Sequence, residues 1–274
     1  MKTRVLSGII MLPLLVVIAL GGKVLLVACF LLTLLALWEF YRGFENIKHK
    51  PVAGIGYAAT LVLYVATFLF FQPEIARWMV GRFETFYLLW FFLCTFACLL
   101  CMFRFNTRTM VDGMATLTGI AYIVFFAYHV VLVESEFGLA VWFVVLAAFG
   151  TDIFAYFTGV LWGKHKLCPN ISPKKTVEGA FGGLIGSVLL CFLFNLIFLK
   201  GNPVVALSLG FLCGITSQFG DLTASLFKRQ MGIKDYGKII PGHGGVLDRI
   251  DSLLFTAPTV YYSLMVGGLI TSSI

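Results

Sequence analysis

The sequence predicts an all-α membrane protein, a polytopic bundle of about nine transmembrane helices. Of the 274 residues, 60% are hydrophobic and 12% carry a charge, whereas soluble domains average about 45–50% and about 25%. The apolar residues gather in runs long enough to cross a bilayer, which takes about 20 residues of helix. These runs lack the alternation of apolar and polar residues that marks membrane β-strands, so helices are favoured.

Nine apolar runs follow one another along the chain, separated by short segments that hold most of the charges. They are residues 5–21, 24–41, 52–71, 85–103, 114–133, 138–161, 179–199, 204–226 and 252–271. The first run follows a charged start and has the general form of a signal peptide. Because the second run begins after only a short turn, we interpret the first as an uncleaved helix.

The positions of lysine and arginine predict the topology, because these residues are enriched in cytoplasmic loops. With a cytoplasmic N-terminus, 16 of the 20 lysines and arginines fall on the inside and 4 on the outside. The polar loops 162–178 and 227–251 then both face the cytoplasm. The net charge of +7 is mostly a result of this topology, and some of it can attract anionic lipid. Nothing in it indicates nucleic-acid binding.

We expect one membrane-embedded domain, residues 1–274, with an uneven distribution of polar groups. Residues 1–137 have the character of scaffold helices, and residues 138–274 hold nearly every unusual polar side chain. Small residues spaced by four also cluster in the second half and allow close helix packing. They are Gly179 and Gly183, Gly182 and Gly186, and Gly210 and Gly214. Contacts within the fold or between subunits would both use them.

Carboxylates within the apolar runs are candidates for function, because a charge at bilayer depth costs at least about 2.5 kcal/mol. Asp152 lies in the middle of one run, and Asp221 lies near the cytoplasmic end of another, one turn before Ser225. For Asp152, a hydrogen-bonded core residue is an equal alternative. Glu39 lies beside Trp38 and Tyr41, aromatic residues typical of a membrane interface, and is better explained as structural.

Asp248 and Asp251 are three residues apart and share one face at the start of the last helix. Together with Asp221 they offer the oxygen ligands that Mg²⁺ prefers, usually alongside substrate phosphates. The alternative is that Asp248 caps the helix and Asp251 pairs with Arg249 or a lysine. The three carboxylates together favour a metal site.

Two polar segments have the chemistry of phosphate binding. Residues 241–245, Pro-Gly-His-Gly-Gly, form a turn whose N–H groups can converge on an anion ahead of a helix N-terminus. His243 could donate to a phosphate or protonate a leaving group, and it could equally hold the turn. Lys174 and Lys175 could neutralise a triphosphate, although ordinary positive-inside charge would explain them as well.

The segment 225–251 resembles the signature of the phosphatidate cytidylyltransferases, also called CDP-diacylglycerol synthases. The matching residues stand at that family's spacing. They are Ser225, Lys228, Arg229, Lys234, Asp235, Gly237, His243, Gly244, Gly245, Asp248, Arg249 and Asp251. The Thr-Asp-x-x-Ala-Tyr pattern at residues 151–156 and the Ser-Pro-Lys-Lys-Thr-x-Glu-Gly loop at residues 172–179 are also similar to that family.

The resemblance implies that CTP and phosphatidic acid react to give CDP-diacylglycerol and pyrophosphate. It implies catalytic roles for Asp221, Asp248, His243 and Lys228. Mg²⁺, as one or two divalent ions or with an added monovalent cation, would be held by Asp152, Asp221, Asp248 and Asp251. The residues expected to bind substrate are Lys174, Lys175, Thr176, Ser225, Arg229, Lys234, Gly244, Gly245 and Arg249.

The expected setting is the cytoplasmic membrane, with the site facing the cytoplasm, a homodimer, contact with membrane lipids and no nucleic-acid partner. One alternative is a CTP-dependent transferase or kinase that acts on a polyprenol-type lipid. Another is a secondary transporter of an anionic solute, which should have broken helices in two related halves. The polar groups here lie almost entirely in the second half, which favours the enzyme.

Overall fold

The protein is almost entirely helical, as the sequence predicts. The computed structural model describes residues 15–70, 82–103, 107–239 and 244–271. Within these ranges, six helical stretches are long and apolar enough to cross a membrane. They are Gly22–Ile47, Ala53–Phe70, Thr85–Met102, Met110–Trp162, Val177–Leu199 and Pro203–Gln230. An all-α, multi-pass membrane protein is therefore confirmed, and the expected number of nine spans stays a prediction.

The chain forms two compact units, and each contains segments far apart in sequence. Unit 1 consists of residues Met1–Phe125 and Met231–Asp248, and unit 2 of residues Phe126–Gln230 and Arg249–Ile274. The polar segment 231–248 thus belongs with the N-terminal helices.

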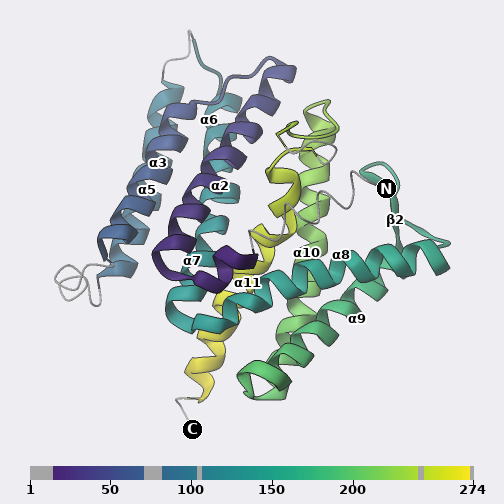
Figure 1. Cartoon of the computed structure of the whole chain (residues 1–274). Coiled ribbons are helices and arrows are strands. Elements are labelled where there is room, and N and C mark those ends of the chain that lie inside the picture. Colours follow the sequence, from purple (N-terminus) through teal and green to yellow (C-terminus); the bar gives the residue numbers. More distant parts are fainter. Residues whose placement is uncertain (1–14, 71–81, 104–106, 240–243, 272–274) are drawn as a thin grey trace. The chain divides into compact units, whose positions relative to one another are not determined.

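Unit 1 is a bundle of helices that lie side by side (Figure 1). Its elements are α2 (Gly22–Gly43), a 3₁₀ turn (Phe44–Ile47), α3 (Ala53–Phe70), α5 (Phe83–Met102), α6 (Met110–Gly119) and a π-helical turn (Ile120–Phe125). Tyr41 is central to the packing. Its hydroxyl donates to the Thr116 carbonyl at 2.8 Å, and its ring occupies the space that a side chain would need at Gly56 or Gly119.

Unit 2 is built around long helices. Its elements are α7 (Phe126–Phe137), a 3₁₀ turn (Gly138–Ala140), α8 (Val141–Trp162), β1 (Lys166–Cys168), β2 (Ser172–Thr176), α9 (Val177–Phe194), a π-helical turn (Asn195–Leu199) and α10 (Pro203–Gln230), followed by α11 (Leu247–Thr271) from Arg249 onward. The chain turns between α7 and α8 at Gly138, whose φ of 54° suits glycine.

Glycines let α8, α9 and α10 approach closely within this unit. A Cβ on Gly183 of α9 would lie 2.8 Å from the Thr151 carbonyl oxygen of α8, and one on Gly210 of α10 would lie 2.6 Å from the Cα of Val188 in α9. Gly182 and Gly186 also face side chains of α8. The predicted small-residue spacings are therefore used for contacts inside the fold.

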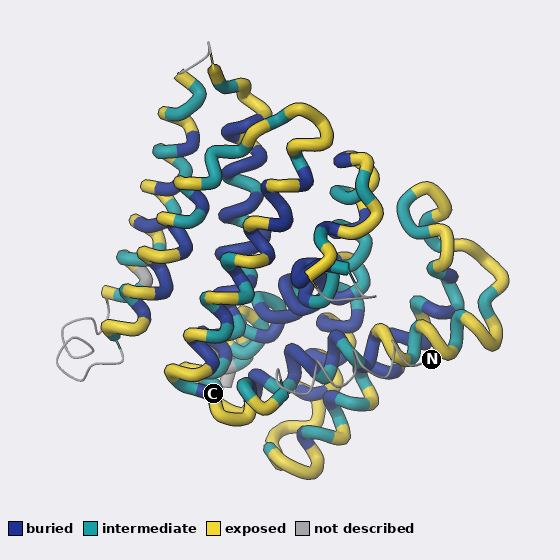
Figure 2. Tube along the Cα trace, turned by 45° about the horizontal axis from the view of Figure 1, so that its top comes forward, coloured by how far each residue is buried: buried dark blue, intermediate teal, exposed yellow. Residues whose placement is uncertain are grey.

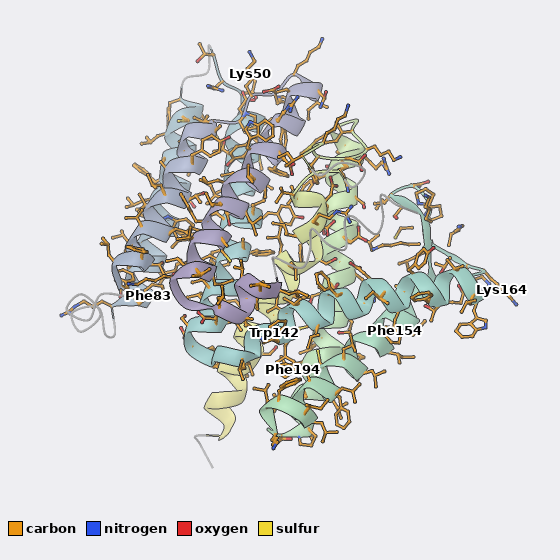
Figure 3. The ribbon with its side chains drawn as sticks, viewed as in Figure 1. Lys50, Phe83, Trp142, Phe154, Lys164 and Phe194 are labelled. Atoms are coloured by element: carbon orange, nitrogen blue, oxygen red, sulfur yellow. The ribbon has the colours of Figure 1, made fainter. Side chains whose placement is uncertain are left out.

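Large apolar side chains cover much of the outer surface, as expected where lipid replaces water as the surrounding medium. Val160, Phe181 and Ile185 are each about two-thirds exposed, while the opposite sides of the same helices contain buried residues (Figure 2). Inside unit 2, the rings of Trp142 and Phe194 join α8 to α9 with centroids 6.4 Å apart (Figure 3).

Candidate active site

A small antiparallel hairpin precedes α9 and forms the base of the candidate site. Strand β1 pairs with β2 so that Lys166 stands opposite Thr176 and Cys168 opposite Ser172. From the sequence, only a polar loop is expected here. Glu178 fixes the start of the hairpin, because its carboxylate accepts from the N–H groups of Lys164 and His165 and lies 2.6 Å from the His165 ring.

Thr176 ends the hairpin and begins α9. Its side-chain oxygen accepts from the Gly179 N–H at 3.1 Å, which makes it the N-cap of the helix. The backbone of the hairpin is also tied to α10, since Arg229 Nε donates to the Ile171 carbonyl at 3.2 Å. Strand β2, which carries Lys174 and Lys175, is therefore held at both ends.

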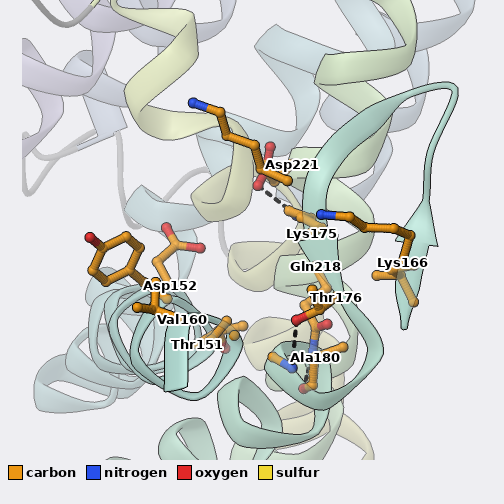
Figure 4. Close-up of a pocket in the computed structure, with 15 residues that line it drawn as sticks. Thr151, Asp152, Val160, Lys166, Lys175, Thr176, Ala180, Gln218 and Asp221 are labelled. Carbon is orange, nitrogen blue, oxygen red and sulfur yellow. Dashed lines mark hydrogen bonds and ion pairs between the residues drawn. The ribbon is translucent and has the colours of Figure 1, made fainter. Parts of the chain in front are cut away.

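A cavity of about 450 Å³ lies between α8, the hairpin, α9 and α10, all in unit 2 (Figure 4). Its size falls in the range of small-molecule sites, about 300–1,000 Å³. Helix α9 contributes Gly179 and Ala180, and the charged and polar side chains that line the cavity come from the other three walls. They are Thr151, Asp152 and Tyr156 of α8, Lys166, Lys174, Lys175 and Thr176 of the hairpin, and Gln218 and Asp221 of α10.

Three of the predicted carboxylates come together in unit 2. Asp152 of α8, Asp221 of α10 and Asp251 of α11 lie close enough for their charges to act on one another. Asp251 is buried, with 8% of its surface exposed, and one of its oxygens accepts from the Ser252 N–H. Carboxylates this close together in a bundle of apolar helices remain ionised only where cations lie beside them.

Basic side chains supply positive charge to this cluster. The ammonium group of Lys175 lies 2.6 Å from an Asp221 carboxylate oxygen (Figure 4). The charge of Lys228, in the last turn of α10, acts on Asp251, and that of Arg249 acts on Asp152. Ser225 donates to Asp221 at 3.4 Å. Acidic and basic groups thus alternate around the cavity and the helix ends next to it.

Unit 1 contains a second part of the predicted site, the turn that leads into α11. The carboxylate of Glu39, fully buried in α2, accepts from the N–H groups of Val246 and Leu247 at 3.0 and 2.8 Å. A side chain on Gly237 or Gly245 would overlap this carboxylate. Glu39 therefore binds the first N–H groups of α11, which supports its interpretation as a structural residue.

Asp248, in the first turn of α11, also contacts this turn. Its Oδ2 accepts from the N–H groups of Tyr236 and Gly245, both at 2.9 Å, so it binds the segment ahead of the helix, whereas Glu39 binds the first N–H groups of the helix. Gly244 has a φ of 90°, which favours glycine. Lys234 lies in the exposed segment before the turn. The predicted His243 lies outside the described residues.

The chain has relatives of known family along nearly its whole length. Residues 2–266 match the Cytidylyltransferase family. The chain belongs to this family. It is similar to the phosphatidate cytidylyltransferases of Staphylococcus epidermidis (34% identical over 261 residues), Staphylococcus haemolyticus (35% over 266) and Staphylococcus aureus (34% over 262), in each case over 94% of this chain and 96% of the relative.

As a member of the Cytidylyltransferase family, the protein is a nucleotidyltransferase. Its three clustered carboxylates have the chemistry of ligands for a divalent metal ion. Carboxylate oxygens on three helices are the donors that Mg²⁺ takes in sites shared with phosphates. Among the described residues, no three His, Cys, Asp or Glu side chains already surround one point, and Lys175 contacts Asp221. The donor set fits a divalent ion that is completed by substrate oxygens.

Several residues at the cavity have no individual role predicted from the sequence. Lys166, Tyr156 and Gln218 line it, and the pair His165–Glu178 shapes its hairpin. Lys166 and Glu178 resemble ordinary loop and helix-start charges in sequence. Gln218 is recognisable from sequence, because it is a polar side chain inside an apolar helix, one turn before Asp221.

Proposed function

We propose that the protein transfers the cytidylyl group of CTP to phosphatidic acid, giving CDP-diacylglycerol and pyrophosphate. The observation that carries the proposal is the cavity of unit 2, in which Lys174 and Lys175 stand beside Asp152 and Asp221. Relatives that are similar over nearly the whole chain are named for phosphatidate as the acceptor, which supports the same substrate here.

The reaction is a substitution at phosphorus that needs no protein nucleophile. An oxygen of the phosphatidate phosphate forms a bond to the α-phosphorus of CTP, and the bond from that phosphorus to the bridging oxygen of pyrophosphate breaks. Catalysis of such transfers consists mainly of alignment and charge neutralisation. Four negative groups must be gathered in one place: three phosphates of CTP and one of the lipid.

In unit 2 the basic residues fit the binding of these anions. We propose that Lys174 and Lys175 bind the triphosphate, since both line the cavity. Lys228 and Arg229, at the end of α10, and Arg249, at the start of α11, would hold the phosphatidate head group, because arginine suits two-pronged contact with phosphate. Ser225, which donates to Asp221, and Thr176, which follows Lys175 in β2, would contact the substrates beside them.

Asp152, Asp221 and Asp251 would hold Mg²⁺, which when bound neutralises phosphate oxygens and orients them. We propose the same role for Asp248, which precedes Asp251 by one turn in α11. The motif at residues 225–251 further suggests four residues that would bind the substrate phosphates. They are Lys234, His243, Gly244 and Gly245. We further propose a cytoplasmic membrane location, a site that faces the cytoplasm, a homodimer and no nucleic-acid partner.

The test uses purified protein in detergent with phosphatidic acid and CTP labelled at the α-phosphate, with and without Mg²⁺. We expect Mg²⁺-dependent transfer of label into the lipid with equimolar release of pyrophosphate. Asp221→Asn should lower the rate at least about 100-fold, the scale of losing a charge contact in a transition state. Glu45→Gln, at an exposed carboxylate, should have no effect.

Two results would contradict the proposal. Label that enters a polyprenol and not phosphatidic acid would make the protein a cytidylyltransferase with another acceptor. An Asp221→Asn protein with unchanged rate and unchanged Mg²⁺ dependence would remove the carboxylate cluster from the mechanism.

A further inference from the structure

The side-chain amide of Gln218 is held in one orientation at the wall of the cavity. Gln218 lies on α10, one turn before Asp221, and lines the cavity (Figure 4). Its Nε2 donates to the carbonyl of Ala180 at 3.2 Å and to that of Gly214 at 3.0 Å. Both neighbours are acceptors, so only the NH₂ end of the amide can face them.

The other end of the amide is therefore a fixed acceptor. If the amide turned over, Oε1 would face two carbonyl oxygens and both hydrogen bonds would be lost. Within the described part of the chain, no protein group donates a hydrogen bond to Oε1. A fixed acceptor in a cavity of about 450 Å³ selects ligands that present a hydrogen-bond donor.

The position of Gln218 relative to the charged groups fits the shape of a nucleotide. Gln218 and Asp221 are three residues apart on one face of α10, and Lys175 lies at Asp221. A triphosphate at Lys174 and Lys175 would leave the part of the cavity near Gln218 and Ala180 for the nucleoside. The exposed ring of Tyr156 lines the same cavity and offers an apolar face to a base.

We propose that Gln218 is the residue that selects cytosine, by accepting a hydrogen bond from the 4-amino group of the base. Cytosine presents this donor, whereas uracil presents a carbonyl oxygen at the same position. If uracil took the place of cytosine, its 4-carbonyl oxygen would face Oε1 of Gln218, and two acceptors would be opposed in a site of low dielectric. This inference rests on the proposed function, because it takes CTP as the ligand of the cavity.

The experiment measures equilibrium binding of labelled nucleotides to the full-length protein in detergent, with Mg²⁺ and without phosphatidic acid. The probes are CTP, UTP and the triphosphate of pyrimidin-2-one riboside, which lacks the 4-amino group. We expect the native protein to bind CTP at least about 100-fold more tightly than either of the others, as sites built to bond a polar group reject analogues that lack it.

The variant is Gln218→Leu, which keeps the approximate size of the side chain and removes the acceptor. It should bind the three nucleotides with affinities equal within about threefold, mainly through a loss for CTP. The matched control is Thr216→Val, on the same helix and outside the cavity lining, which should keep the full preference for CTP. The comparison within one variant separates recognition from packing, because a loss of packing weakens all three nucleotides alike.

The proposal is overturned if Gln218→Leu retains the native ratio of CTP to UTP affinity, whether or not the three affinities all fall by the same factor. Should this variant not fold, the native protein can still overturn the proposal, because equal binding of CTP and the pyrimidin-2-one analogue would exclude a bond to the amino group. A failure of the proposed function has a different result: CTP would bind selectively and label would still not enter phosphatidic acid.

Discussion

At the scale of single residues, the contact with Asp221 distinguishes Lys175 from its neighbour Lys174, for which the sequence predicts the same role. Lys175 lies 2.6 Å from Asp221, and both line the cavity. We predict that Lys175→Met raises the KM for CTP by about 10-fold or more, since a hydrogen bond to a charged group contributes about 1.5–3 kcal/mol. The measurement is the initial rate of lipid labelling at varied CTP.

Lys164 provides the control for this prediction. It is exposed and lies directly before the hairpin, and its side chain does not line the cavity. Lys164→Met should leave the KM for CTP within about twofold of the native value. Equal increases in the two variants would indicate a general effect of positive charge near the membrane, and the specific contact with the triphosphate would be wrong.

The residues that could be predicted from sequence are those whose chemistry conflicts with their surroundings. Asp152 stands out because a carboxylate within an apolar helix is costly, and the structure places it with Asp221 and Asp251. The partners of Glu39 could not be predicted, because Val246 and Leu247 are more than 200 positions away and contribute only backbone N–H groups. Such contacts leave no pattern in the side chains.

At the scale of elements, the N-terminus of α11 depends on a carboxylate from another helix. Glu39 binds the N–H groups of Val246 and Leu247 with its two oxygens. In Glu39→Gln the amide nitrogen would face one of these donors, which leaves a buried N–H without an acceptor and destabilises the fold by about 1–3 kcal/mol. We predict a fall in melting temperature of several degrees, at about 2–4 °C per kcal/mol.

Melting of the purified protein in detergent, followed by tryptophan fluorescence, checks this prediction. Glu45→Gln serves as control, because Glu45 lies in the 3₁₀ turn after α2 and is exposed. It should melt within about 1 °C of the native protein, as substitutions at exposed sites usually change stability by less than about 0.5 kcal/mol. Identical melting of Glu39→Gln and native protein would show that the contact contributes nothing to stability.

The contact between α8 and α9 gives a second prediction at this scale. Gly183→Ala would place a methyl group 2.8 Å from the Thr151 carbonyl oxygen, and a backbone atom cannot rotate away. We expect a loss of about 1–3 kcal/mol from overpacking. Gly54→Ala in α3 has nothing within 4 Å, so it should be neutral or slightly stabilising, because alanine favours helix. Thermal melting of both variants should separate them clearly.

Helices and the hairpin differ in how far they could be predicted. The run 52–71 corresponds to α3 at Ala53–Phe70, and the run 85–103 to α5 at Phe83–Met102, because the limits of an apolar run are set by the limits of the bilayer. The hairpin of β1 and β2 was missed. Its strands are only three and five residues long, and its bonds to Glu178 and Arg229 are tertiary contacts.

At the scale of the whole molecule, the distribution of lysine and arginine predicts which side of the membrane each loop occupies. Lys164, directly before the hairpin that lines the cavity, is expected in the cytoplasm, and Arg82, at the start of α5, is expected on the outside. Both side chains are exposed. We predict that a membrane-impermeant maleimide labels Arg82→Cys in intact bacterial cells and labels Lys164→Cys only after the membrane is opened.

Native protein, in which most cysteines are buried in helices, gives the background labelling for both variants. The result bears directly on function, because Lys164 reports the side on which the hairpin and therefore Lys174 and Lys175 lie. CTP is present in the cytoplasm, so a cavity on that side has access to its substrate. Labelling of Lys164→Cys in intact cells would put the cavity on the outside and would exclude CTP as its ligand in the cell, whatever the purified protein does in detergent.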